Sequence, residues 1–160
     1  MAIRTIRTQG DEVLTKKSRP VKEMTPRLRE LIADMLDTMY EANGVGLAAV
    51  QVGILRRIVT IDVGEGPIIL VNPEIVFAEG EQTGEEGCLS VPGMSGQVTR
   101  PNHVKVKALD MDMNQVEYEG EELLARAFCH EIDHLDGKMY TDLVEGELHQ
   151  VTYEDEEEEE

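Results

Sequence analysis

The sequence has 160 residues, a length that suits one compact domain with a substantial core. Its 15 basic and 33 acidic residues give a formal net charge of −18, which argues against a protein that binds nucleic-acid phosphates or anionic membranes. Seven of the negative charges form the acidic run Glu154–Glu160, which is typical of a solvated tail. We therefore predict one domain over residues 1–153 and a disordered acidic tail over residues 154–160.

The cysteines and apolar runs indicate a cellular location. The two cysteines, Cys88 and Cys129, are too few for a disulfide framework at this length. The first residues lack the apolar run of a signal peptide, and no stretch approaches the roughly 18 apolar residues of a membrane span. We expect a cytoplasmic protein without direct contact to membranes or nucleic acid.

The predicted elements begin with an irregular arm over residues 1–24. A helix follows from a Thr25 cap and Pro26 to about Asn43, because apolar residues recur there at helical spacing. Short segments rich in Ile and Val then predict strands at residues 57–63, 67–71, 74–78, 103–109 and 116–118. A second helix is predicted over residues 121–135. This order lacks regular βαβ alternation and indicates an α+β fold with a mostly antiparallel sheet.

The pattern His-Glu-Ile-Asp-His at residues 130–134 lies on the second predicted helix. Two imidazoles four residues apart share one helix face, as a divalent metal ion requires, and Glu131 would lie beside the metal as a general base. The alternative is a charged helix with surface histidines. Two of only four histidines fall in this pattern, which favours the metal site.

Two histidines leave a metal ion short of ligands. Cys88 precedes His130 by 42 residues, and its thiolate would complete a Cys-His-His site with one position open to water. Taken alone, Cys88 is more commonly a small buried residue, and Cys129 is expected to turn away into the core. Other candidate third ligands stand downstream, at Glu145, Glu147 and His149.

A third motif, Gly-Val-Gly-Leu-Ala-Ala-Val-Gln, occupies residues 44–51. It satisfies the glycine pattern of dinucleotide-binding loops, but a helix precedes it where that fingerprint needs a strand. The alternative is a loop whose backbone approaches a ligand closely, with Gln51 as an amide donor.

Together, this motif, Glu-Gly-Cys-Leu-Ser at residues 86–90 and His-Glu-Ile-Asp-His-Leu at residues 130–135 closely resemble the signature of the peptide deformylase family. The resemblance extends to about Asp142. It implies antiparallel sheets around a central helix that carries the metal site, with Cys88, His130 and His134 as ligands. It also implies removal of the N-formyl group, as formate, from the formyl-methionine of newly made polypeptides.

In that family a metal-bound water is the nucleophile, so Glu131 takes the role of general base and acid. Gln51 and the backbone N–H of Leu89 resemble the oxyanion donors. The resemblance implies one divalent metal ion, usually Fe(II), although Zn(II), Ni(II) or Co(II) suit the same donors. The residues expected to bind the substrate are Val45, Gly46, Glu86, Gly87, Leu123, Arg126 and Ala127.

The chain also departs from the family pattern. Arg126 stands where an apolar residue is usual, and it either reaches the methionine pocket or extends outward with its stem packed. Asp133 either orients a ligand histidine, pairs with Arg100 or faces solvent. We also expect the usual C-terminal helix to be absent, as in a short form similar to phage-encoded members. This leaves only a transient ribosome contact as an expectation. We expect a monomer.

Two other classes of protein remain as alternatives. A metallopeptidase shares the histidine motif but does not call for Cys88 as a ligand, and formyl-peptide and internal amide substrates would separate the two. An acidic metal-binding protein without turnover is the other alternative, and Glu131 and Gln51 argue against it.

Overall fold

Helix α1 (Pro26–Glu41) is the first long element of the computed structural model, which describes residues 2–151. As predicted, the Thr25 hydroxyl caps it by accepting a hydrogen bond from the Leu28 amide at 3.2 Å. The buried face of α1 packs with Ile58 and Val71 of the sheet, and it consists of Leu31, Ile32, Met35 and Met39. No helix among residues 2–151 is long and apolar enough to cross a bilayer.

The arm before α1 is irregular, as predicted, apart from the short 3₁₀ helix η1 (Glu12–Thr15). Its backbone is docked onto the body of the protein. The Arg7 N–H donates to the Gln51 carbonyl at 2.6 Å, and the Gln9 N–H donates to the Ser90 carbonyl at 2.7 Å. The arm therefore braces two segments that carry site motifs.

The larger sheet has five antiparallel strands in the order β1-β2-β3-β6-β7. The predicted strands 67–71 and 74–78 are parts of one long strand, β3, with a register shift between Val71 and Glu74. The predicted pairing across the turn at residues 110–114 is confirmed, with Val106 opposite Tyr118. The strands are β1 (Gly46–Ala48), β2 (Ile58–Ile61), β3 (Ile68–Glu79), β6 (His103–Leu109) and β7 (Gln115–Glu121). The 3₁₀ helix η2 (Ala49–Val52) follows β1.

The strands of a second sheet were not among the segments predicted from local sequence pattern. This sheet is antiparallel, with the order β4-β5-β8, and its strands are β4 (Gln82–Cys88), β5 (Val91–Arg100) and β8 (Glu145–Gln150). These segments are rich in Gly and polar residues, and only Val91 and Val98 are buried apolar residues in them. Strand signals depend on apolar alternation, so the sequence offers little here.

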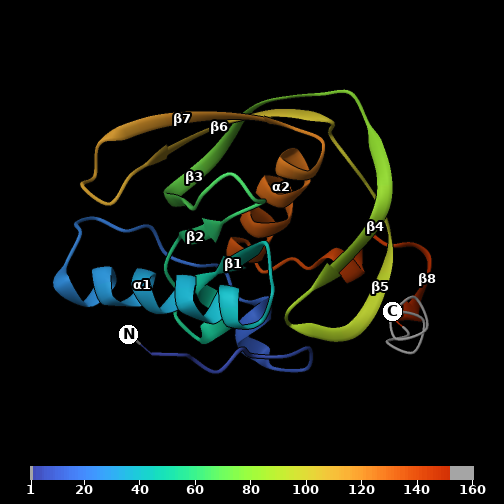
Figure 1. Ribbon diagram of the computed structural model, residues 1–160, viewed down its shortest axis with the longest axis horizontal. Coiled ribbons are helices and arrows are strands. Elements are labelled where there is room, and N and C mark those ends of the chain that lie inside the picture. The colour runs from blue at the N-terminus through green and yellow to red at the C-terminus, as the bar shows by residue number, and fades with distance from the viewer. Residues whose placement is uncertain (1, 152–160) are drawn as a thin grey trace.

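Helix α2 (Leu123–Leu135) lies at the centre of the fold, under the arch of β3, β6 and β7 and beside the β4–β5 hairpin (Figure 1). Phe128 and Leu135 are fully buried in the core of the larger sheet. A separate cluster under the smaller sheet includes Leu14, Val98 and Tyr140 of the 3₁₀ helix η3 (Tyr140–Asp142). The α+β fold with mostly antiparallel sheets around a central helix is confirmed. The predicted tail lies outside the described residues, and the single domain stays a prediction.

Candidate metal centre and active site

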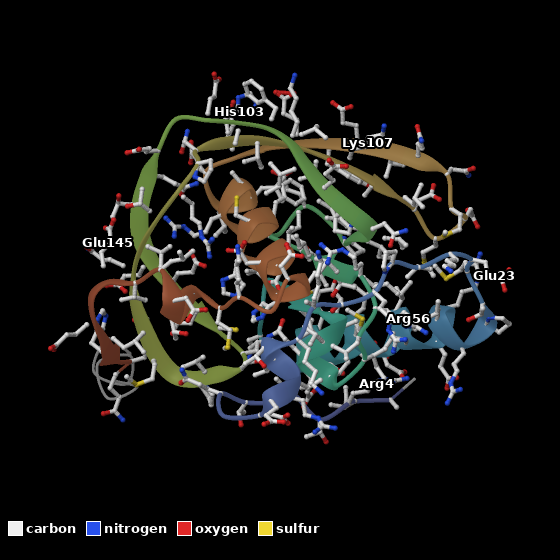
Figure 2. The ribbon with its side chains drawn as sticks, turned by 180° about the vertical axis from the view of Figure 1, so that it is seen from behind. Arg4, Glu23, Arg56, His103, Lys107 and Glu145 are labelled. Carbon is white, nitrogen blue, oxygen red and sulfur yellow. The ribbon has the colours of Figure 1, made fainter. Side chains whose placement is uncertain are left out.

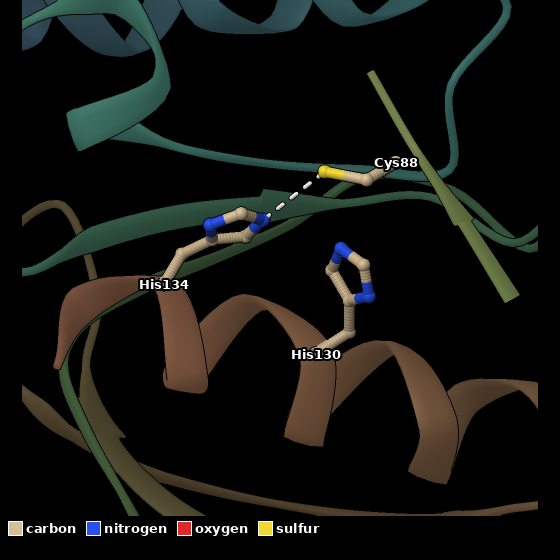
Figure 3. Close-up of side chains that lie close together, drawn as sticks. All are labelled: Cys88, His130 and His134. Atoms are coloured by element: carbon tan, nitrogen blue, oxygen red, sulfur yellow. Dashed lines mark hydrogen bonds between the residues drawn. The ribbon is translucent and has the colours of Figure 1, made fainter. Parts of the chain in front are cut away.

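Helix α2 presents two imidazoles to the end of strand β4. The ring centroids of His130 and His134 are 5.0 Å apart, and both rings reach from α2 toward Cys88 (Figure 3). Cys88 Sγ lies 3.2 Å from His134 Nε2, and the three donor atoms lie within 4.8 Å of one another. Sulfur and nitrogen ligands of one tetrahedral ion lie about 3.6 Å apart. The three side chains therefore fit a single metal ion.

The downstream candidate ligands contact other groups. His149 Nε2 lies 3.0 Å from Ser95 Oγ and 3.2 Å from Glu85 Oε1, and Glu145 accepts a hydrogen bond from Thr99 at 2.8 Å. Within residues 2–151, the group of metal-ligating side chains that the fold brings together is Cys88, His130 and His134.

Glu86 fixes the orientation of His130. His130 Nδ1 lies 2.5 Å from Glu86 Oε1, and a carboxylate accepts, so the ring donates from Nδ1 and keeps Nε2 for a metal. Arg100 donates to the same carboxylate through Nη2 at 2.7 Å and Nε at 3.2 Å. Burial alone would raise the pKa of Glu86, but the hydrogen bonds from His130 and Arg100 outweigh burial and lower the pKa to about 2. The carboxylate thus orients a candidate metal ligand, a role that the sequence analysis did not assign to it.

Arg126 does not extend outward, and it lies buried in the wall of the cavity beside the histidines. Its Nη1 donates to Glu86 Oε2 at 2.7 Å and to the Val98 carbonyl at 3.1 Å, and the side chain is buried. A buried guanidinium needs an anionic partner, and Glu86 supplies it. Asp133 pairs with Arg100 at 2.7 Å, which was one of its predicted roles.

Glu131 is enclosed beside His130 and His134. Its Oε2 lies 3.9 Å from His130 Nε2, and its Oε1 has no hydrogen-bond partner among the described residues. Gly46 makes this enclosure possible, because a β-carbon there would collide with the Glu131 carboxylate. Burial raises the pKa of Glu131 to about 7 and lowers the pKa of His134 to about 3. An unpartnered buried carboxylate is costly, which supports a site that a bound group completes.

Gln51 is held with its amide toward Cys88. Gln51 Oε1 accepts from the Ala48 N–H at 2.9 Å, while Nε2 donates to Ser90 Oγ at 3.0 Å and lies 3.5 Å from Cys88 Sγ. Sequence analysis missed Ser90 as a partner, although its place in the Cys88 motif was a signal. It also missed Tyr140, whose ring stacks on His130 with centroids 5.9 Å apart and which no motif marks.

A cavity of about 580 Å³ lies beside Cys88, His130 and Glu131. All seven residues expected to bind substrate lie in its wall, and so do Gln51, Leu89, Cys88, His130 and Glu131. His134 lies behind them and is fully buried. Sequence analysis missed other parts of the wall, which include Pro92, Gly93, Met94 and Val151. A thiol, two imidazoles and an enclosed carboxylate at one cavity are the arrangement of a mononuclear metalloenzyme.

Comparison with known proteins identifies the family. The family model "Polypeptide deformylase" matches residues 3–149. The chain is 68% identical to a peptide deformylase of Agathobacter rectalis, over 97% of this chain and 98% of the relative. It is 64% identical to a peptide deformylase of Lachnoclostridium phytofermentans over the whole of both proteins. The crystal structure of peptide deformylase from Thermotoga maritima has a TM-score of 0.88 and 41% identity, covering 90% of this chain and 99% of that chain. The chain belongs to the polypeptide deformylase family.

The relatives from Agathobacter rectalis and Lachnoclostridium phytofermentans are bacterial proteins, and this chain covers almost all of each. The sequence analysis had expected a short form similar to phage-encoded members. The last described element is the strand β8, which pairs with β5.

Proposed function

We propose that Cys88, His130 and His134 hold one divalent metal ion and that Glu131, Gln51 and the backbone N–H of Leu89 carry the reaction. The chain removes the N-formyl group, as formate, from the N-terminal formyl-methionine of newly made polypeptides, the activity of its family. One observation carries the residue assignment: Cys88 from β4 meets both histidines of α2 beside an enclosed carboxylate.

A metal ion held by these side chains supplies Lewis acidity and a water molecule of lowered pKa. Glu131 accepts a proton from the attacking water and delivers it to the amine nitrogen that leaves. Its Oε1 has no competing hydrogen bond among the described residues, which supports this role. Glu86 keeps His130 in the tautomer that leaves Nε2 for the metal.

Gln51 Nε2 and the Leu89 N–H donate to the formyl oxygen as it gains negative charge. Ala48 and Ser90 hold the Gln51 amide in place before the substrate arrives, so little reorganisation is needed. Both Gln51 and Leu89 lie in the cavity wall with Glu131, which supports their action on one carbonyl group.

The substrate peptide binds in an extended pose along β1. This strand is the outermost of the larger sheet, so one of its edges is not paired with another described strand and is open to strand addition. Gly46 begins this strand and Val45 precedes it, and both line the same cavity as Gly87. The methionine side chain packs against Leu123, Ala127 and the aliphatic stem of Arg126.

Fe(II) is the proposed metal, with Zn(II), Ni(II) or Co(II) as ions that the same donors accept. With iron, the thiolate ligand makes the enzyme sensitive to oxygen and peroxide. A cytoplasmic location, a monomeric state and a transient contact with the ribosome complete the proposal.

The test is formate release from formyl-Met-Ala-Ser by anaerobically purified, iron-loaded protein, with metal content measured in parallel. We expect release by the wild type and a loss of about 10²–10⁴-fold for Glu131→Ala, which removes the proton carrier. A Glu131→Ala variant that keeps full activity would reject this role for Glu131. Absence of release from wild type with a full equivalent of bound metal would reject the proposed activity.

A further inference from the structure

Arg126 places a charged group in the wall of the active-site cavity. Charged side chains such as Glu23, Lys107 and Glu145 lie on the outside of the molecule (Figure 2). Arg126, by contrast, is only 7% exposed and lines the cavity. A guanidinium group stays charged at physiological pH, and its buried N–H groups need acceptors. The acceptors that the protein provides, and those that it does not, therefore indicate what this part of the wall binds.

The protein provides acceptors for only one nitrogen of this guanidinium group. Nη1 donates to Glu86 Oε2 at 2.7 Å and to the Val98 carbonyl at 3.1 Å, which uses both of its N–H groups. Nε and Nη2 carry the three other N–H groups, which have no acceptor among residues 2–151. Neither atom is fully enclosed by these residues. Glu86 and Val98 thus fix the guanidinium group in place, and its remaining donors are available to a ligand.

The spacing along α2 places Arg126 where a bound methionine side chain would end. One face of the helix lines the cavity with residues three or four positions apart, which are Leu123, Arg126, Ala127 and His130. Arg126 lies about one turn before His130, and one turn rises about 5.4 Å. In extended formyl-methionine the sulfur lies five bonds from the formyl carbon, about 6 Å away. A substrate that lies along this face with its formyl group beside His130 therefore brings its sulfur to Arg126.

We infer that Arg126 recognises the methionine sulfur, because an N–H group of its Nε or Nη2 donates to Sδ of the substrate. The inference rests on the proposed function, which places formyl-methionine in this cavity. A thioether sulfur is a weak acceptor, but a charged donor and the low dielectric of a buried site strengthen the bond. Norleucine has the same length with a methylene group in place of sulfur, so it leaves the donors of Arg126 without an acceptor. An entirely apolar wall would instead favour the more apolar methylene group.

The experiment compares three substrates that differ at one position of the side chain. Formyl-Met-Ala-Ser, its norleucine analogue and its O-methylhomoserine analogue carry sulfur, a methylene group and an ether oxygen there. The ether oxygen is the strongest acceptor and the least apolar group, so a donating wall and an apolar wall predict opposite orders of reactivity.

The quantity measured is kcat/KM for formate release by the metal-loaded full chain, as wild type, Arg126→Met and Leu123→Ala. Leu123→Ala is the matched control, because it removes an apolar part of the same wall and no hydrogen-bond donor. Peptides are compared within each protein, so a difference in metal content between the proteins does not affect the ratios.

For the wild type we expect kcat/KM to be about tenfold higher for the ether peptide than for the norleucine peptide, with the methionine peptide between them. In Arg126→Met the order should reverse, and Leu123→Ala should slow all three peptides and keep the wild-type order. A wild type that prefers norleucine would overturn the inference, a result that needs no variant to fold. The wild-type order in Arg126→Met, or a reversal in Leu123→Ala, would also overturn it. Absence of formate from every peptide would instead reject the proposed function.

Discussion

Helix α2 and the β4–β5 hairpin both build the site, but they are held in place differently. Helix α2 is packed into the apolar core of the larger sheet by Phe128, Ile132 and Leu135. The hairpin buries few apolar side chains, and Glu86 ties it to α2 through His130 and Arg126. Apolar packing thus places the two histidines proposed as metal ligands, and buried charge contacts align Cys88 with them. The distance between Cys88 and the histidines should therefore depend strongly on single polar residues.

The largest expected effect on stability is in the α2 core. Phe128→Ala removes a fully buried ring and should lower the free energy of unfolding by about 3–5 kcal/mol. Val98→Ala in the hairpin is the comparison, and its smaller lost volume should cost about 2 kcal/mol. Urea unfolding of both variants measures the difference. Equal losses would contradict the view that the two regions are stabilised differently.

Arg126→Met tests the charge contacts between the regions. The variant loses charge-assisted bonds to Glu86 and Val98, so it should lower the free energy of unfolding by about 2 kcal/mol. Glu86 then holds His130 less firmly, and metal affinity should fall about 10- to 100-fold, measured by competition with a chelator. Arg126→Lys keeps the positive charge and should recover part of the affinity. An unchanged metal affinity in Arg126→Met would show that Arg126 does not influence metal binding.

Thr25→Ala should lower the stability of α1 without touching either region. Loss of the N-cap hydrogen bond to Leu28 should cost about 1 kcal/mol in the free energy of unfolding. Metal affinity and kcat/KM should stay at the wild-type values. A change in metal affinity would show that α1 also sets the geometry of the site.

The smallest effect concerns pH and the outer face of the larger sheet. Hydrogen bonds from His103 to Glu119, at 2.6 Å, and to Glu79, at 3.2 Å, raise the pKa of His103. The protonated form is thus favoured in the folded state, so its contribution is complete below the unfolded pKa of about 6.5 and is lost as pH rises through the folded pKa. His103→Gln should flatten this small decline in a series of unfolding curves at increasing pH. An unchanged pH profile would contradict the assignment.

Helix α2 and the β4–β5 hairpin also differ in how well the sequence predicted them. Helices α1 and α2 carry regular apolar spacing, α1 also has the Thr25 cap, and both helices were predicted to within a few residues. The β4–β5 hairpin has glycines at positions 84, 87, 93 and 96 and almost no apolar alternation, so it was missed. Its pairing depends on long-range contacts that no local pattern encodes.

The motifs identified residues of the site, but they did not predict the contacts between residues that lie far apart in the sequence. The three motifs marked Cys88, Gln51 and Glu131, which the fold gathers at one cavity. The bond from Arg126 to Glu86 joins residues 40 apart in sequence, and the stack of Tyr140 on His130 depends on the path of η3. Such contacts follow from tertiary packing, so no characteristic residue spacing in the sequence marks them.

The central claim is that Cys88 of the hairpin and two histidines of α2 bind one metal ion. X-ray absorption spectroscopy of zinc-loaded protein tests this claim most directly. We expect one sulfur ligand at about 2.3 Å and two imidazole nitrogens at about 2.0–2.1 Å, with the sulfur lost in Cys88→Ser. A zinc site without sulfur in the wild type, or a sulfur ligand that persists in Cys88→Ser, would contradict the account.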